Sequence, residues 1–127
     1  MKSVVVTGAS TGIGKDAARI LIENGYRVYG SVRKEEDAER LVSEFGERLI
    51  PLIFDVTDEA AVFEAAKQVQ DELRGETLFG LVNNAGVAVA GPMMHIPIDN
   101  FRQQLEINVT GQLIVSQAFI PLLGADR

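Results

Sequence analysis

Two patterns of apolar residues alternate along the chain. Short runs rich in β-branched residues are each followed by a longer stretch in which apolar residues recur at spacings of three and four. The short runs predict strands, and the longer stretches predict amphipathic helices. We expect strands at 3–7, 27–32, 49–54 and 78–82, a loop at 83–98, and helices at about 12–24, 35–45, 59–74 and 99–123.

Each of the first three expected helices has an apolar side that would face a sheet. Strand–helix units in this order are typical of an α/β protein with a parallel sheet. A first strand that is apolar throughout fits a central position buried on both faces. The residues expected to point inward are Ala17, Ala18, Leu21 and Ile22 in the first helix, Ala38, Leu41, Val42 and Phe45 in the second, and Val62, Ala65, Ala66, Val69 and Leu73 in the third.

Size and composition favour one domain and exclude several classes of partner. With 127 residues, 46% of them hydrophobic, the chain can bury an ordinary core. It has no cysteine, which excludes disulfides and cysteine-based metal sites, and we expect no metal site. A net charge of −6 argues against nucleic acid as a partner. We see neither a signal peptide nor a membrane-spanning stretch, so we expect a cytoplasmic protein with no membrane partner.

Three glycines lie in the connection between the first expected strand and helix, where residues 7–14 read T-G-A-S-T-G-I-G. Glycines let a ligand approach the backbone N–H groups at the positive end of a helix, and a diphosphate suits such a site. A glycine-rich turn without a ligand is the alternative. A Walker A loop is excluded, because its first glycine is missing and Asp16 stands where a hydroxyl should bind Mg²⁺. The spacing also differs from the usual G-x-G-x-x-G dinucleotide fingerprint.

Four features together resemble the short-chain dehydrogenase/reductase family. They are the T-G-x-x-x-G-x-G connection, Asp55 after the third strand, N-N-A-G at 83–86 after the fourth, and Asn108 in the last helix. The resemblance covers the whole chain and implies a Rossmann-type, doubly wound parallel sheet with the strand order 3-2-1-4, truncated after the long helix. It also implies that residues 1–127 form a single NAD(P)-binding domain, the N-terminal half of a larger enzyme.

The resemblance assigns cofactor-binding roles to particular residues. Those that match the family's diphosphate loop are Gly8, Ser10, Gly12, Ile13 and Gly14. Asp55 matches the residue that accepts a hydrogen bond from the adenine amino group, with the backbone of Val56 beside it. A carboxylate that caps the next helix is the alternative for Asp55. Thr7 would join the segment after the fourth strand, whose residues that line the ribose and stabilise the sheet edge would be Asn83, Ala85 and Gly86.

The end of the second expected strand bears on the choice of cofactor. In this fold it lies near the adenosine ribose, where an acidic residue would repel a 2′-phosphate. No acidic residue stands at 29–34, and Arg33 offers a bidentate donor suited to phosphate. We therefore expect NADP(H) in preference to NAD(H), with Ser31 as a minor contact. The alternative is that Arg33 and Lys34 are a solvated pair at the start of a helix, which would leave the choice between NADP(H) and NAD(H) open.

Asn108 resembles the family's active-site asparagine. Asparagine is a poor residue in the middle of a helix, and the resemblance implies that it interrupts the helix so that a backbone carbonyl can hold a water of the proton relay. A polar residue on an exposed turn is the alternative. N-V-T at 108–110 spells a glycosylation sequon, which we discount because no secretory signal precedes it. His95, beside Met93 and Met94, is expected to be a surface residue of the loop.

The family's catalytic serine, tyrosine and lysine have no counterparts in the chain. Tyr26 and Tyr29 are its two tyrosines, and Gly30 and Arg33 stand four residues later in place of a lysine. The fourth strand also lacks the charges and prolines that protect a natural sheet edge. We therefore expect the isolated chain to be inactive and to need a C-terminal half or a partner chain. The complete enzyme would act on a small carbonyl or alcohol substrate and form homo-oligomers, as the family usually does through its long helices.

Two other functions fit part of the pattern. The chain could be a non-catalytic nucleotide-binding or assembly module whose open sheet edge and last helix bind a partner. A phosphoacceptor receiver domain shares the length, the acidity and an aspartate after the third strand. Such a domain needs an acidic pair after its first strand, where this chain has Thr7 and Gly8. A faint likeness of 29–33 and 91–98 to hydroxysteroid and retinol dehydrogenases points to an apolar substrate.

Overall fold

In the part of the chain that the structure describes, four parallel strands form one sheet: β1 (Ser3–Val6), β2 (Arg27–Val32), β3 (Leu49–Ile53) and β4 (Gly80–Val82). Their order, β3-β2-β1-β4, is the one that the family resemblance implied, so the Rossmann-type fold is confirmed. The computed structural model describes residues 1–88 and 91–124. Residues 89–90 of the expected loop, and residues 125–127, where the expected truncation falls, lie outside the described residues.

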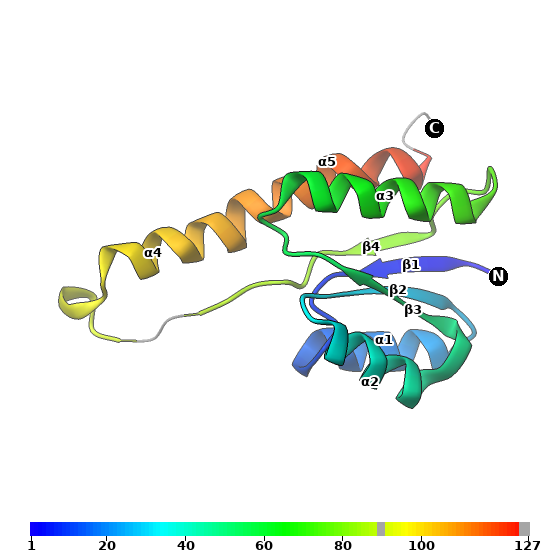
Figure 1. Ribbon diagram of the computed structural model, residues 1–127, viewed down its shortest axis with the longest axis horizontal. Coiled ribbons are helices and arrows are strands. Elements are labelled where there is room, and N and C mark those ends of the chain that lie inside the picture. The colour runs from blue at the N-terminus through cyan, green and yellow to red at the C-terminus, as the bar shows by residue number, and fades with distance from the viewer. Residues whose placement is uncertain (89–90, 125–127) are drawn as a thin grey trace.

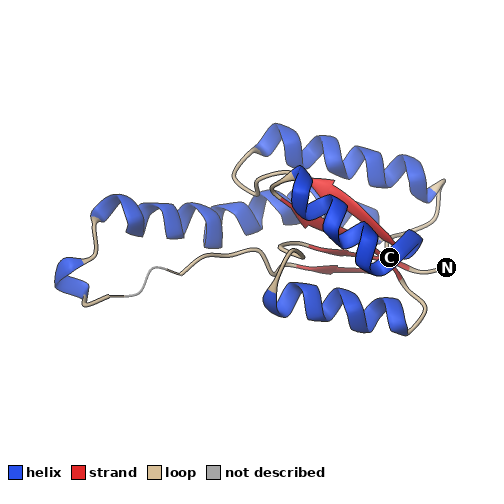
Figure 2. Cartoon of the chain, turned by 60° about the horizontal axis from the view of Figure 1, so that its bottom comes forward, coloured by secondary structure: helices blue, strands red, loops and turns tan. Residues whose placement is uncertain are grey.

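Helices cover both faces of the sheet (Figures 1 and 2). One face carries α1 (Gly12–Glu23) and α2 (Glu35–Phe45), and the other carries α3 (Glu59–Leu73) and α5 (Gly111–Phe119). Helix α4 (Ile98–Leu105) projects beyond the strands and is joined to α5 by a π-helical segment. That segment is Glu106–Thr110, and short 3₁₀ turns span Gly46–Arg48, Met93–His95 and Ile120–Leu123.

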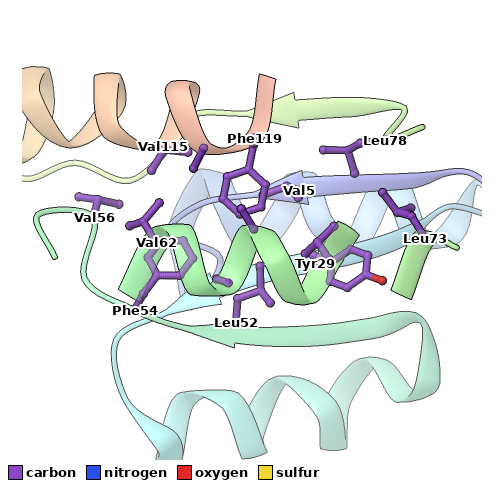
Figure 3. Packing of buried hydrophobic residues seen from close by; sticks show 14 of the residues in the cluster. Val5, Tyr29, Leu52, Phe54, Val56, Val62, Leu73, Leu78, Val115 and Phe119 are labelled. Carbon is purple, nitrogen blue, oxygen red and sulfur yellow. The ribbon is translucent and has the colours of Figure 1, made fainter. Parts of the chain in front are cut away.

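Successive strand residues build a core on each face of the sheet. Val5, Tyr29 and Leu52 point toward α3 and α5 and belong to the larger cluster of buried side chains (Figure 3). Val4 and Val28 lie on the opposite face and pack with residues of α1 and α2. This alternation follows from the pleat of a strand, which directs neighbouring side chains to opposite faces. All of β1 is buried, because it is central and helices cover both faces.

The inward side of the second helix is confirmed except at Val42. Ala38 and Leu41 are buried in α2, and Phe45 is partly buried against the same core. Val42 is 41% exposed. Each residue of a helix is turned by about 100° from the one before, so Val42 points away from the core that Leu41 enters. The inward residues expected for the third helix are all buried in α3.

The fourth strand and the last helix differ from their expected bounds. Strand β4 begins at Gly80, two residues later than expected, although the N–H of Phe79 already donates to the carbonyl oxygen of Ser3 (2.8 Å). The N–H of Leu78 donates to the carbonyl oxygen of Leu122 (2.7 Å). The helix expected at 99–123 changes to a π-helix at Glu106–Thr110 and tightens to a 3₁₀ turn at Ile120–Leu123. Pro121 lies at the start of that turn, where its missing N–H interrupts the α-helical hydrogen bonding.

Candidate functional site

A cavity of about 330 Å³ opens at the carboxyl ends of the strands. Its wall is built from the β1–α1 loop, the β2–α2 loop, the residues after β3 and the loop after β4. In parallel sheets with helices on both faces, ligands bind at this end of the strands. The residues predicted from the sequence that line the cavity are Gly8, Ser10, Ser31, Arg33, Asp55, Val56, Ala85 and Gly86.

The glycines of the β1–α1 loop have different surroundings. Gly8 and Gly12 have φ angles of 67° and 61°, a left-handed conformation that favours glycine. A Cβ at Gly12 would meet no atom within 4 Å, so the start of α1 is open there. A Cβ at Gly14 would collide with the carbonyl oxygen of Gly8 and the side-chain amide of Asn84. Gly14 therefore lets α1 pack closely against the loop.

Thr7 fastens the loop after β4 to β1. Its buried hydroxyl oxygen accepts hydrogen bonds from the backbone N–H groups of Asn84 (2.9 Å) and Ala85 (3.0 Å). The Asn84 side-chain amide in turn donates to the carbonyl oxygen of Gly8 (3.1 Å). This is the connection between neighbouring strands expected for Thr7. Shielding a backbone N–H from water without a partner costs free energy, so the hydroxyl holds the loop after β4 in place.

Ser31 fastens the β1–α1 loop to β2. The N–H of Gly8 donates to the Ser31 hydroxyl oxygen (3.0 Å), and the N–H of Ala9 donates to the Ser31 carbonyl oxygen (2.9 Å). Ser31 is 3% exposed, so these contacts are shielded from water. Its side chain positions Gly8 and also forms part of the cavity wall.

Charged residues gather where β2 meets α2. Arg33 and Lys34 are exposed at the rim of the cavity, and Asp37 lines it from the first turn of α2. One turn later, the Nη2 atom of Arg40 lies 3.0 Å from the carbonyl oxygen of Ser10 and 3.2 Å from Oδ1 of Asp37. This corner offers guanidinium and ammonium groups to an anionic ligand.

Asp55 forms a turn directly after β3. Its Oδ1 atom accepts hydrogen bonds from the backbone N–H (2.9 Å) and the hydroxyl (2.7 Å) of Thr57. These two bonds hold the pKa of Asp55 below its ordinary value, and the positive charge of Arg33 acts in the same direction. The residue that caps α3 is Asp58, whose side chain accepts from the N–H of Ala61 (3.1 Å). Capping of α3 therefore does not account for Asp55.

Asn108 lies in the π-helical segment and binds the loop after β4. The N–H of Val87 donates to Oδ1 of Asn108 (2.8 Å), and Nδ2 of Asn108 donates to the carbonyl oxygen of Val87 (2.6 Å). The helix is thus irregular at this residue, as expected, and the side chain is partly buried. Asn83 bonds elsewhere, because its amide donates to the hydroxyl oxygen of Ser116 in α5 (3.1 Å).

Five residues predicted from the sequence lie beside the cavity and outside its lining, namely Gly12, Ile13, Gly14, Asn83 and Asn108. Ile13 is 80% exposed at the start of α1. The lining also contains residues to which no role was assigned: Thr11, Val32, Lys34, Asp37, Phe54, Asn84, Val87 and Ile107. The sequence offered one signal for them, which is that each lies within four positions of a predicted site residue.

Other candidate groups lie away from the cavity. Tyr29 is in the core, where burial raises the pKa of its hydroxyl, which lies 3.4 Å from Glu72. His95 is exposed, as expected, and Met93 and Met94 are exposed as well, so these methionines do not pack under the loop. Within residues 1–88 and 91–124, no three histidine, cysteine, aspartate or glutamate side chains gather to hold a metal ion. No helix in that part of the chain is long and apolar enough to cross a membrane.

Several known proteins are similar to this chain over nearly its whole length. The NADPH-dependent 3-dehydrocapnine reductase of Ornithobacterium rhinotracheale is 42% identical over 127 residues, which are 100% of this chain and 45% of that protein. Retinol dehydrogenase 5 of Homo sapiens is 39% identical over 125 residues, 98% of this chain and 39% of that protein. The crystal structure of NADPH-bound carbonyl reductase from chicken fatty liver matches with a TM-score of 0.86 and 31% identity, over 96% of this chain and 48% of that one.

This chain therefore spans less than half the length of these relatives. The family model described as short chain dehydrogenase matches residues 2–127. Because that match takes in the glycine loop, the four strands and the segment that holds Asn108, the chain belongs to the short-chain dehydrogenase family.

Proposed function

We propose that this chain binds NADP(H) as part of an oxidoreductase that transfers a hydride between NADP(H) and a carbonyl or alcohol substrate. The observation that carries the proposal is the cavity at the carboxyl ends of the strands, with an open glycine turn near one side and Arg33 and Lys34 on another. Two of the relatives are described as NADPH-dependent or NADPH-bound, which supports the same cofactor here.

The residues around the cavity fit a dinucleotide. Nothing stands within 4 Å of the place that a Cβ of Gly12 would take, so a diphosphate has room to approach the N–H groups at the start of α1. We assign the diphosphate loop to Gly8, Ser10, Gly12, Ile13 and Gly14, with Gly14 acting through close packing. We assign the adenine end to Asp55 and Val56, and the ribose side to Asn83, Ala85 and Gly86, with Asn83 anchoring that loop to α5.

Arg33 is the residue that we assign to the 2′-phosphate of NADP(H). It is exposed at the rim beside Lys34, and a guanidinium fork can bind phosphate through two N–H groups at once. Ser31 lies deeper, and its hydroxyl oxygen accepts a hydrogen bond from the N–H of Gly8. We therefore propose that Ser31 helps the cofactor indirectly, by holding the β1–α1 loop in its conformation.

A bound nicotinamide cofactor supplies or accepts the hydride, and the residues of this chain hold the site in shape. Thr7 fixes one end of the loop at 84–87, and Asn108 fixes the other end through Val87. Proton transfer to the substrate oxygen needs an acid–base group, and neither tyrosine lines the cavity. We propose that this group lies in a segment outside residues 1–127 or in a partner chain, because the chain covers only 45% and 39% of the reductase and the retinol dehydrogenase.

An apolar stripe along the last helices suits a protein contact. Its exposed members recur at helical spacing and are Phe101, Leu105, Val109, Leu113 and Ile120. Exposed apolar stripes of this kind mark interaction surfaces. We propose that this stripe pairs subunits in the complete enzyme, as the family resemblance implies.

Titration with NADPH and NADH, followed by nicotinamide fluorescence, tests the proposed cofactor. We expect NADPH to bind more tightly, and Arg33→Met to weaken NADPH binding about tenfold while NADH binding is unchanged. Arg102→Met is the control, because it removes an exposed arginine of α4 that does not line the cavity. Equal affinities of the wild-type protein for the two dinucleotides would contradict the preference, as would an equal loss in both variants.

A second pair of variants tests the glycine loop. Gly12→Ala and Gly25→Ala each place a Cβ at a left-handed φ (61° and 89°) with no atom within 4 Å, so they carry similar strain. Gly12 lies at the start of α1 beside the cavity, and Gly25 lies at its opposite end. We expect NADPH affinity to fall at least about tenfold in Gly12→Ala and to stay unchanged in Gly25→Ala. Unchanged affinity in both variants would contradict the assigned diphosphate loop.

An intact-mass spectrum of protein purified from its source separates an enzyme from a binding module. A larger species, or a second polypeptide that copurifies and restores carbonyl turnover, supports the oxidoreductase. A single species with the mass of 127 residues that binds NADPH without turnover favours a nucleotide-binding module.

A further inference from the structure

We propose that Arg40 is a positioning residue for the 2′-phosphate corner: it ties the β1–α1 loop to α2 and, by pairing with Asp37, keeps that carboxylate from repelling a 2′-phosphate. The inference rests on the proposed function, because it concerns the preference for NADPH over NADH. Arg40 does not itself line the cavity. It acts through two groups that do.

A single guanidinium nitrogen makes both contacts. Nη2 of Arg40 donates to the carbonyl oxygen of Ser10 at 3.0 Å and lies 3.2 Å from Oδ1 of Asp37. Ser10 is 30 positions away in the β1–α1 loop, so this bond joins that loop to α2, whereas Asp37 is one turn away on α2 itself. Ser10 and Asp37 both line the cavity. Arg40 therefore connects the loop assigned to the diphosphate with the corner assigned to the 2′-phosphate.

Asp37 puts a negative charge into the wall that carries Arg33 and Lys34. Its side chain is 24% exposed, compared with 51% for Arg40, so water screens the carboxylate less than it screens the guanidinium. An unpaired carboxylate at this place would weaken the attraction of the rim for phosphate. The penalty would fall on NADPH, because NADH has no 2′-phosphate. Pairing with Arg40 balances the charge of Asp37 within one turn of α2.

A matched ion pair elsewhere shows what a structural role alone would do. Asp16 and Arg19 on α1 have the same three-residue spacing, and both are well exposed. Neither of them lines the cavity. Exposed ion pairs contribute little to stability, so Arg19→Met removes such a pair, together with the stacking of Arg19 on the Phe45 ring (5.7 Å), at a place away from the cavity. Arg40→Met removes a similar pair and also leaves Asp37 unbalanced in the cavity wall.

The test measures dissociation constants for NADPH and NADH in the full-length wild-type protein and in Arg40→Met, Arg40→Met/Asp37→Asn and Arg19→Met. We expect Arg40→Met to weaken NADPH binding about threefold to tenfold and NADH binding less than about twofold. The excess loss for NADPH reports the freed carboxylate, and the smaller loss that both dinucleotides share reports the broken tether to Ser10. The double variant should recover the wild-type preference, and Arg19→Met should change neither constant.

Asp37→Asn alone keeps the test decisive if Arg40→Met does not fold. It should tighten NADPH binding about twofold or more without changing NADH binding, because the rim loses a negative charge. The inference is overturned if the ratio of the two dissociation constants is the same in wild type, Arg40→Met and Asp37→Asn. It is also overturned if Arg40→Met changes this ratio and the double variant does not return it to the wild-type value. A wild-type protein that binds neither dinucleotide overturns the proposed function, and this inference with it.

Discussion

The two ends of the sheet contain glycines that share a positive φ but have different surroundings. At the amino ends, three left-handed glycines close helix-to-strand turns, and a Cβ on any of them would meet no atom within 4 Å: Gly25, Gly46 and Gly75. At the carboxyl ends, left-handed Gly8 packs so closely on Ala85 that a Cβ would lie 2.9 Å from its Cα. A positive φ therefore marks a turn, whereas a binding site also needs several loops to converge.

The side chains at the two ends differ as well. At the amino ends, the rings of Tyr26 and Phe79 lie 5.3 Å apart, and the Lys2 ammonium is 4.6 Å from the Phe79 ring. At the carboxyl ends, the side chains of Thr7 and Asn108 bond to the backbone of other loops. Aromatic packing closes one end, and hydrogen-bonded loops leave a cavity at the other.

The largest expected difference between the ends is at their glycines. Gly14→Ala forces a Cβ into the carbonyl oxygen of Gly8, so it should lower the free energy of unfolding by about 3 kcal/mol. Gly25→Ala adds only strain at a left-handed φ and should cost about 1 kcal/mol. Urea denaturation of both variants measures the difference. Equal losses would mean that α1 can move away from the loop without cost.

A smaller difference is expected between two asparagines. Asn108→Ala removes two partly buried hydrogen bonds to Val87 and should cost about 2 kcal/mol. Asn24→Ala at the amino end removes one exposed bond to the carbonyl oxygen of Ile20 and should cost about 0.5 kcal/mol. Denaturation gives the energies, and amide hydrogen exchange should show faster exchange at Val87 in Asn108→Ala. Unchanged protection of Val87 would show that the loop is held by other contacts.

The smallest effect is a pH dependence confined to the carboxyl end. The folded-state pKa of Asp55 is lowered by its bonds to Thr57, so folding favours the ionised carboxylate. The stability it contributes is present above its unfolded-state pKa of about 3.9 and is lost as the pH falls through the lower folded-state pKa. We expect wild type to lose more stability than Asp55→Asn below about pH 4. Thr57→Val should show an intermediate loss, and identical acid profiles for all three proteins would contradict the role of these bonds.

The sequence predicted the elements of the fold well because the apolar spacing differs between strands and helices. It did not show which strands pair, and the order of the sheet came from the family resemblance. The bounds that were wrong depend on contacts distant in sequence. Leu78, at the expected start of the fourth strand, bonds through its N–H to Leu122, and the helix around Asn108 is distorted where Asn108 binds Val87.

The site was predictable where its residues follow one another in the chain. The glycine motif located the β1–α1 loop, but its letters could not show that Gly14 packs against Gly8 while Gly12 stays open. The bond from Arg40 to Ser10 could not be predicted, because 30 residues separate them and helical spacing indicates only the pair with Asp37. Contacts between loops follow from the folded sheet, which local patterns do not specify.

The pairing of β1 has a consequence for the order in which the chain folds during synthesis. The pairing of β1 with β2, and of β2 with β3, involves residues that are synthesised early. The hydroxyl oxygen of Thr7 accepts a hydrogen bond from Asn84, which is synthesised 77 residues later. A chain emerging from the ribosome can therefore assemble three strands while one edge of β1 is still open. Until β4 arrives, the cavity lacks the wall formed by residues 84–87. A ligand that needs this wall can therefore stabilise the protein only after β4 has docked.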